Sequence, residues 1–169
     1  ITEPNTGSDV ANVRTSAVRH GDAWVVNGSK TFITNGINSD LIITTVRTND
    51  QPGHRGLSLL ILERGMKGFE RGRNLSKLGM HAQDTAELSF TDVEVPSENV
   101  LGVEGQGFVY LMQNLAQERL NMAVGGVKVA SSALQATLDY TKDRKAFGQS
   151  IATFQNSKFV LAEIATEVQ

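Results

Sequence analysis

Glycine and proline, the residues that most often interrupt regular structure, are unevenly distributed along this chain. All three prolines and most of the 16 glycines precede residue 108, and only Gly125, Gly126 and Gly148 follow it. Closely spaced turn residues restrict a chain to short strands, whereas a long stretch without them permits long helices. The distribution therefore predicts a turn-rich first part and a helix-rich second part.

The turn-rich part has the pattern of short strands. Residues 23–26 and 30–34 flank Asn27-Gly28, a pair typical of a two-residue hairpin turn. Five or more short strands with no helical pattern between them predict a small all-β sandwich or barrel. The other strand-like runs are residues 41–48, 57–62, 87–90 and 92–95.

Two helices are predicted in the second part. Apolar residues recur at three- and four-residue steps from about residue 105 to 145, and again from about Thr153 to the end. Gly148 is a suitable stop between them. Neither helix can bury its apolar stripe alone, so each requires partners. The fold class is therefore α+β, with a small all-β domain followed by two long helices.

Composition excludes several classes of protein. A formal net charge of −2 offers no basic surface for nucleic acid or an anionic membrane. The absence of cysteine excludes disulfides, thiolate catalysis and cysteine-ligated metals. No apolar run approaches the ~18 residues of a membrane span, and the three histidines lack metal-ligand spacing. Because the chain begins at Ile1 and ends within a helical pattern, we expect it to be part of a longer protein.

Glu118 is the strongest candidate for a functional side chain. It shares one helical face with Leu111, Leu115 and Met122. A carboxylate on an apolar face is costly to bury unless it is paired or lies in a cleft. Desolvation would raise its pKa, as a general base near neutral pH requires. The alternative is a structural ion pair with a neighbouring helix.

Two other segments allow an anion-binding interpretation. The backbone amides of Gly7-Ser8-Asp9 are suited to an anion, although the same residues are typical of an ordinary surface turn. Arg144 and Lys145 follow the first helix, where cations either complement the helix dipole or bind a phosphate-bearing ligand.

Several short motifs extend over the whole length of the chain. They are Ile1–Pro4 with Gly7–Asp9, Asn27–Gly36, Gly65–Phe69, Ala82–Leu88, Gln117–Leu120, and Arg144–Gly148 with Gln155. Together these motifs resemble the acyl-CoA dehydrogenase family, and Gly65–Phe69, Ala82–Leu88 and Gln117–Leu120 resemble its long-chain branch most closely.

The family fold has an N-terminal helical domain, a middle β domain and a C-terminal four-helix bundle. The resemblance implies a middle β barrel or sandwich domain at residues 1–103 and the start of an incomplete helical bundle at 104–169, with the N-terminal helical domain absent.

The resemblance implies FAD-dependent α,β-dehydrogenation of acyl-CoA thioesters in fatty-acid β-oxidation. In this chemistry a glutamate removes the α-proton and the β-hydride passes to flavin N5. Most members place the glutamate late in the bundle, whereas long-chain and isovaleryl-CoA dehydrogenases carry it in the first bundle helix, before an arginine. Glu118-Arg119 stands at that place, so the resemblance and the helical-face argument select the same catalytic base.

Further contacts are implied position by position. Phe32 would pack on the flavin ring, Thr34 would offer its hydroxyl near N5, and Arg144 would approach the flavin diphosphate from a neighbouring subunit. Val109 stands where long-chain relatives tend to carry tyrosine, which leaves chain-length preference open. The implied FAD contacts are Ile1, Thr2, Gly7, Ser8, Phe32, Ile33, Thr34, Arg144, Phe147 and Gln155. The implied acyl-CoA contacts are Ser8, Val109, Ala116, Gln117 and Arg119.

The resemblance also implies partners and a compartment. The expected electron acceptor is electron-transfer flavoprotein, and the full-length protein would be a homo-oligomer, a tetramer or a dimer. Its location would be the mitochondrial matrix or a bacterial cytoplasm. Two alternatives remain open, an acyl-CoA oxidase that passes electrons to oxygen and a family member that serves only binding or assembly.

Overall fold

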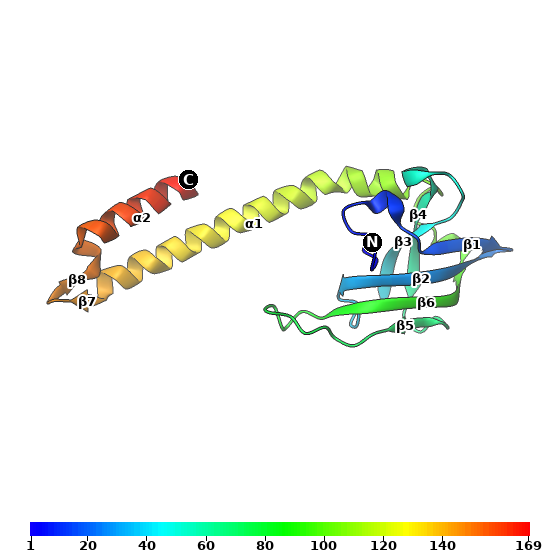
Figure 1. The fold of residues 1–169 in the computed structure, drawn as a ribbon, viewed down its shortest axis with the longest axis horizontal. Coiled ribbons are helices and arrows are strands. Elements are labelled where there is room, and N and C mark those ends of the chain that lie inside the picture. The colour runs from blue at the N-terminus through cyan, green and yellow to red at the C-terminus, as the bar shows by residue number, and fades with distance from the viewer. The chain divides into compact units, whose positions relative to one another are not determined.

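The computed structural model describes residues 1–169, which divide into two compact units, residues 1–113 and residues 114–169 (Figure 1). The first unit contains six strands and the start of a long helix, which continues into the second unit. Short 3-10 turns lie at Val10–Asn12, Gly53–Gly56, Ser97–Asn99 and Ile151–Thr153. The main elements are β1 (Ser16–His20), β2 (Ala23–Thr34), β3 (Leu41–Arg47), β4 (Leu57–Glu63), β5 (Phe69–Arg71), β6 (Thr85–Pro96), α1 (Gly107–Asp143), β7 (Lys145–Ala146), β8 (Gln149–Ser150) and α2 (Gln155–Val168).

The first unit is built on one six-stranded sheet with the order β4-β3-β1-β2-β6-β5. All neighbours are antiparallel except β1 and β3, which pair in parallel at Ser16 and Arg47. The β3–β4 end lies behind β2 and β6 in Figure 1, and buried side chains from both ends share one core, which includes Leu60 and Leu62 of β4 with Leu88 of β6. The sheet is therefore sandwich-like, and the prediction of an α+β chain with a small β domain is confirmed.

The predicted hairpin turn at Asn27-Gly28 is wrong, because both residues lie inside the continuous strand β2. The turn between β1 and β2 instead lies at Gly21-Asp22. Gly28 has a φ of 147°, and a Cβ there would lie 2.6 Å from Oγ1 of Thr15. Glycine is needed at this position because another segment of backbone approaches closely, which is a second common reason for glycine within a strand.

Two β-bulges shape the pairing of β2 with β6. Between Val26 and Gly28 the extra residue lies on β6, where Asp92 has a φ of 48°. Between Lys30 and Ile33 the extra residue lies on β2, where Phe32 has a φ of 57°. A bulge turns a side chain away from the regular alternation of the strand. The second bulge therefore leaves the side chain of Phe32 exposed, beside a regularly paired Lys30.

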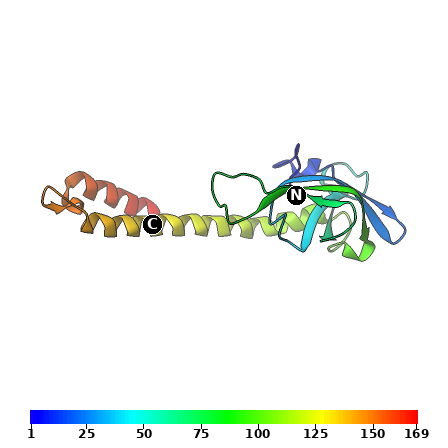
Figure 2. The ribbon, with the colours of Figure 1, turned by 90° about the horizontal axis from the view of Figure 1, so that it is seen from below.

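The second unit contains the rest of α1, the β7–β8 hairpin and α2, which runs back in the opposite direction to α1 (Figures 1 and 2). Phe147 and Gly148 form the two-residue hairpin turn, with φ values of 52° and 78°. Apolar side chains of both helices, including Met122 and Phe159, are exposed within this chain. The predicted pair of helices is confirmed. None of the helices combines the length and apolar character that crossing a membrane requires.

Candidate functional site

The N-terminal loop is attached to β2 just before the Phe32 bulge. The backbone N–H of Thr31 donates to the carbonyl of Thr2 at 2.9 Å. A pair of backbone hydrogen bonds between Glu3 and Thr6, at 2.8 and 3.1 Å, closes the loop on itself. The structure thus brings together two segments that are distant in sequence, the first residues of the chain and the segment that carries Phe32.

A buried ion pair reinforces this attachment. Nζ of Lys30 lies 2.8 Å from Oε1 of Glu3, and the side chains are only 2% and 6% exposed. Lys30 also donates to the carbonyls of Thr45 at 2.7 Å and Ile1 at 3.2 Å, so all three ammonium protons have acceptors. Burial lowers the pKa of Lys30 below its ordinary value, and the hydrogen bond and charge of Glu3 offset only part of this effect.

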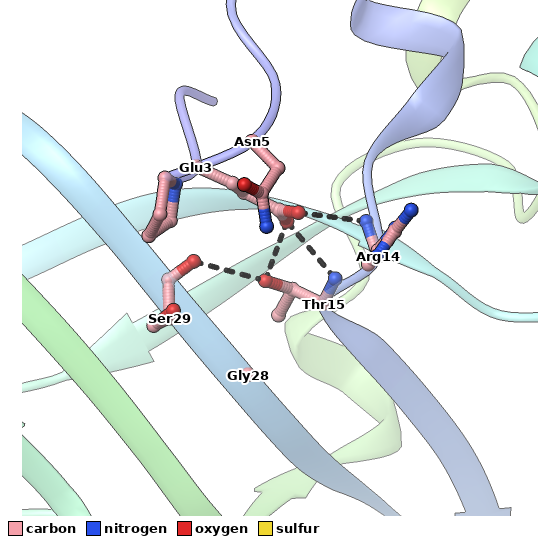
Figure 3. Close-up of a pocket in the computed structure, with 7 residues that line it drawn as sticks. Glu3, Asn5, Arg14, Thr15, Gly28 and Ser29 are labelled. Atoms are coloured by element: carbon pink, nitrogen blue, oxygen red, sulfur yellow. Dashed lines mark hydrogen bonds between the residues drawn. The ribbon is translucent and has the colours of Figure 1, made fainter.

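The carboxylate of Glu3 receives a full set of donors (Figure 3). Oε2 accepts from the N–H of Arg14 at 2.8 Å, and Oε1 accepts from the N–H and hydroxyl of Thr15 at 2.9 and 2.6 Å. Burial alone would raise the pKa of Glu3, but these hydrogen bonds and the one from Lys30 together outweigh burial and lower it. Glu3 therefore remains ionised inside the protein and joins the loop to the start of β1.

This lowered pKa predicts a specific acid sensitivity. Unfolded Glu3 takes up a proton near its ordinary value of 4.5, whereas the folded carboxylate resists protonation to lower pH. The stabilisation by Glu3 should therefore be complete above pH 4.5 and be lost as the pH falls through the lowered pKa. We expect the difference in free energy of unfolding between the parent and Glu3→Gln, measured with urea from neutral pH to acid, to shrink in this range. A difference that does not change with pH would contradict this assignment.

The turn that follows Thr34 is held from two sides. Asp84, which is buried, accepts from the N–H of Ile37 at 2.7 Å and from the side-chain amide of Asn38 at 2.9 Å. The hydrogen bond from Ile37 is the main reason that the pKa of Asp84 is lowered. The guanidinium groups of Arg64 and Arg71 both donate to the carbonyl of Ile37, at 2.8 and 2.9 Å. The end of β2, with Ile33 and Thr34, is thus fixed on a rigid turn.

The loop after Thr6 presents unused hydrogen-bond donors. Gly7 and Ser8 are exposed, and their N–H groups donate to no acceptor within the chain. The loop keeps its shape because the Thr6 hydroxyl donates to the carbonyl of Asn12 at 3.2 Å, and because Asn12 donates to Asp9. Free backbone N–H groups on an exposed loop suit a ligand that carries hydrogen-bond acceptors.

Glu118 lies on α1 and is exposed, as are its neighbours Ala116, Gln117 and Arg119. The desolvation predicted from its apolar helical face is therefore not present within this chain, because Met122 on the same face is exposed as well. Leu111 and Leu115 are only partly buried.

Val109, the remaining predicted substrate contact, is exposed on the first turn of α1 in the first unit. That turn is anchored to the sheet. A Cβ on Gly107 would lie 2.8 Å from the backbone of Ser58, and the rings of Phe108 and His54 are 4.9 Å apart. The Tyr110 hydroxyl accepts from the N–H of Val103 at 3.0 Å.

In the second unit, the hairpin gathers the three residues that were predicted to contact a nucleotide. Arg144 precedes β7, and its carbonyl accepts from the N–H of Ile151 at 2.9 Å. Phe147 at the hairpin tip is 95% exposed and lies edge-on to Phe154, with ring centroids 6.4 Å apart. Gln155 follows Phe154 as the first residue of α2. All three side chains are exposed at this end of the unit.

Lys30, Glu3 and Asp84 are three structural centres that the sequence motifs did not reveal. The signal for Lys30 was present, because β2 places Trp24 and Val26 on the inner face and strand alternation continues to Lys30, which pairs with buried Leu88. The mistaken turn at Asn27-Gly28 interrupted that alternation. No comparable signal marks Glu3, whose donors lie on Arg14, Thr15 and Lys30, between 11 and 27 residues away.

Two family models match the chain. One, described as the acyl-CoA dehydrogenase middle domain, matches residues 1–93, and the other, described as the acyl-CoA dehydrogenase C-terminal domain, matches residues 105–169.

Similar proteins share both sequence and fold. The mitochondrial long-chain specific acyl-CoA dehydrogenase of Mus musculus is 50% identical over 171 residues, which cover 99% of this chain and 40% of that protein. An acyl-CoA dehydrogenase structure from Geobacillus kaustophilus is 54% identical with a TM-score of 0.94, covering 99% of this chain and 44% of that one. The prolyl acyl carrier protein oxidase AnaB is 31% identical with a TM-score of 0.92, covering the same shares. The chain thus spans less than half the length of these relatives, and its sequence and fold show that it belongs to the acyl-CoA dehydrogenase family.

Proposed function

We propose that the full-length protein is an FAD-dependent acyl-CoA dehydrogenase that catalyses α,β-dehydrogenation of acyl-CoA thioesters in fatty-acid β-oxidation. Members of this family are flavoproteins and oxidoreductases. The observation that carries the proposal is the attachment of Thr2 to Thr31, which joins two flavin-contact segments expected from the sequence. Residues 1–103 would be the middle β domain, and residues 104–169 would begin the helical bundle.

The exposed groups of the first unit suit an isoalloxazine ring. Phe32 is 69% exposed and offers a flat apolar surface, and Thr34 on the same strand offers an exposed hydroxyl. The N–H groups of Gly7 and Ser8 can donate to the polar edge of such a ring. The remaining flavin contacts in this unit would come from Ile1, Thr2 and Ile33. Bound FAD would supply the hydride acceptor, which no protein side chain provides.

We assign removal of the α-proton to Glu118. A carboxylate is a suitable base when its surroundings favour the neutral form, and bound substrate together with the rest of the protein would have to supply that desolvation. Ser8, Val109, Ala116, Gln117 and Arg119 would contact the acyl-CoA. Their role is to hold the α-carbon within hydrogen-bond distance of the Glu118 carboxylate, because misplacement by an ångström can cost about 100-fold in rate.

Arg144, Phe147 and Gln155 would contact the nucleotide half of FAD. We expect Arg144→Ala in the full-length protein to weaken FAD binding by roughly 10- to 100-fold, because charge-assisted hydrogen bonds to a diphosphate contribute about 1.5–3 kcal/mol. The measurement is the FAD dissociation constant of the deflavinated protein, with Lys142→Ala, an exposed cation on the preceding helical turn, as the control. An unchanged dissociation constant in Arg144→Ala would remove the diphosphate role.

The partners and location of the full-length protein are also part of the proposal. Electron-transfer flavoprotein would accept the electrons, and a homo-oligomer, a tetramer or a dimer, would supply Arg144 to a neighbouring site. The location would be the mitochondrial matrix, as the name of the mouse relative states for that protein, or a bacterial cytoplasm.

The experiment that tests the function is anaerobic mixing of the full-length protein with saturated acyl-CoA thioesters of graded length. We expect loss of oxidised flavin absorbance and formation of the 2-enoyl-CoA. Resemblance to a prolyl acyl carrier protein oxidase favours a second candidate, an oxidase that uses oxygen. Reoxidation of the reduced protein by electron-transfer flavoprotein much faster than by dissolved oxygen supports the dehydrogenase, and the reverse supports the oxidase. Flavin that stays oxidised with every thioester would contradict both.

A further inference from the structure

The Lys30–Glu3 ion pair connects four segments of the first unit with directional bonds. Through Lys30 it reaches the carbonyls of Ile1 in the N-terminal loop and Thr45 in β3. Through Glu3 it reaches the N–H groups of Arg14 and Thr15 at the start of β1. Lys30 itself belongs to β2, two residues before the bulge at Phe32.

Stability alone gives a weak reason for burying these charges. Replacing a buried ion pair by apolar residues of similar volume is often neutral or stabilising, because desolvation of two charges offsets their attraction. An apolar pair would fill the same space, but it would form no directional bonds. It would therefore not fix the register of the N-terminal loop against β2. The hydrogen bonds of Lys30 do this, since the ammonium group binds the carbonyl of Ile1 while the next residue, Thr31, binds the carbonyl of Thr2.

The groups set in place by these bonds are the candidate flavin contacts. Ile1 and Thr2 lie on one side of the connection, and Phe32 follows Thr31 on the other. We infer that Lys30 and Glu3 are positioning residues for the flavin site, which fix the N-terminal loop in register with the Phe32 bulge through their buried ion pair. This inference rests on the proposed function, because it assigns the flavin contacts to these two segments.

The test uses three variants of the full-length protein. Glu3→Gln and Lys30→Met each leave one buried charge without its partner, whereas Glu3→Gln/Lys30→Met removes both charges and keeps an amide to accept from Arg14 or Thr15. The matched controls are Glu94→Gln and Lys67→Met, which make the same changes at exposed positions of the same unit. The measurements are the FAD dissociation constant, the visible spectrum of the bound flavin and the midpoint of thermal unfolding of the flavin-free protein.

A positioning role separates flavin binding from stability. Each single variant is expected to raise the FAD dissociation constant at least about tenfold and to lower the unfolding midpoint. In the double variant the midpoint should return close to the parent value, because no buried charge is left unpaired. The FAD dissociation constant of the double variant should still be about tenfold higher than that of the parent, and the spectrum of its bound flavin should differ from the parent spectrum. Both control variants should match the parent in affinity and spectrum.

Several results would overturn the inference. One is a double variant that recovers FAD affinity together with stability, since the pair would then act on folding alone. Another is parent-like FAD affinity in the single variants. If the variants do not fold, hydrogen exchange of the parent protein with and without FAD tests the inference. FAD should slow exchange at the amides of Arg14, Thr15 and Thr31 more than at the amides of β4. An equal effect on both sets of amides would refute the inference. The parent protein distinguishes this inference from the proposed function. If the parent binds FAD and acyl-CoA reduces its flavin, but the variants bind FAD as tightly as the parent, only the inference is refuted. If the parent has no affinity for FAD, the proposed function is refuted as well.

Discussion

Replacing Glu118 by glutamine in the full-length protein is expected to lower the rate of flavin reduction by acyl-CoA far more than ~100-fold, which is a lower value for loss of a general base. Glutamine keeps the size and polarity of glutamate but cannot accept the α-proton. FAD content should be unchanged, because Glu118 is not among the groups proposed to hold the flavin. Glu118→Asp should retain part of the activity, since the base is kept but withdrawn by one methylene group.

The measurement is anaerobic stopped-flow mixing with a saturated acyl-CoA, following the loss of oxidised flavin absorbance. Glu163→Gln makes the same chemical change at an exposed position of α2 and serves as the control. Near-parent reduction in Glu118→Gln would place the base elsewhere. Loss of FAD from the variant would show that Glu118 has a structural role.

The largest effect on stability is expected at Gly68, next to β5. Gly68 has a φ of 82°, and a Cβ there would overlap the carbonyl oxygen of Thr91. The carbonyl of Gly68 accepts from the N–H of Thr91 at 3.0 Å, so the two backbones cannot separate without breaking this bond. Gly68→Ala is therefore expected to lower the free energy of unfolding by about 2–5 kcal/mol, the sum of backbone strain and a steric overlap in a packed site.

Gly65 provides the matched control for this prediction. Its φ of 88° is similar, but a Cβ there would meet no atom within 4 Å. Gly65→Ala should therefore lose only the backbone term, about 1–2 kcal/mol. Urea unfolding of the two variants and the parent separates the steric effect from the strain. Equal losses in the two variants would show that the Thr91 backbone moves aside freely.

The secondary structure was predictable wherever local signals were strong. The stretch after residue 107, which has no proline and few glycines, correctly indicated α1, and β-branched and aliphatic runs correctly indicated β3 and β4. The error at Asn27-Gly28 arose because the same dipeptide serves either a turn or a close backbone approach. Only the position of Thr15, which lies against Gly28, distinguishes these cases.

The candidate site was partly predictable from the sequence, because some of its residues lie in short motifs that act as strong local signals. In the first unit Thr2 is bonded to Thr31, which joins two of the expected segments, and in the second unit Phe147 is exposed at a hairpin tip. The exposure of Glu118 was not predictable, because an apolar helical face shows that its residues require a partner but not whether this chain supplies one. Glu118 and its neighbours Ala116, Gln117 and Arg119 are exposed, so the desolvation expected from the sequence is not present within this chain.

The sequence by itself determined the division into a β unit and long helices, since glycine, proline and apolar periodicity act over a few residues. It also indicated the family, through motifs that are short runs of neighbouring residues. Only the tertiary structure decided that Lys30 and Glu3 form a buried ion pair, and that the bulge turns Phe32 outward. The physical reason is that the pair and its acceptors join segments up to 29 residues apart, and such contacts are selected by packing of the whole sheet rather than by local propensity.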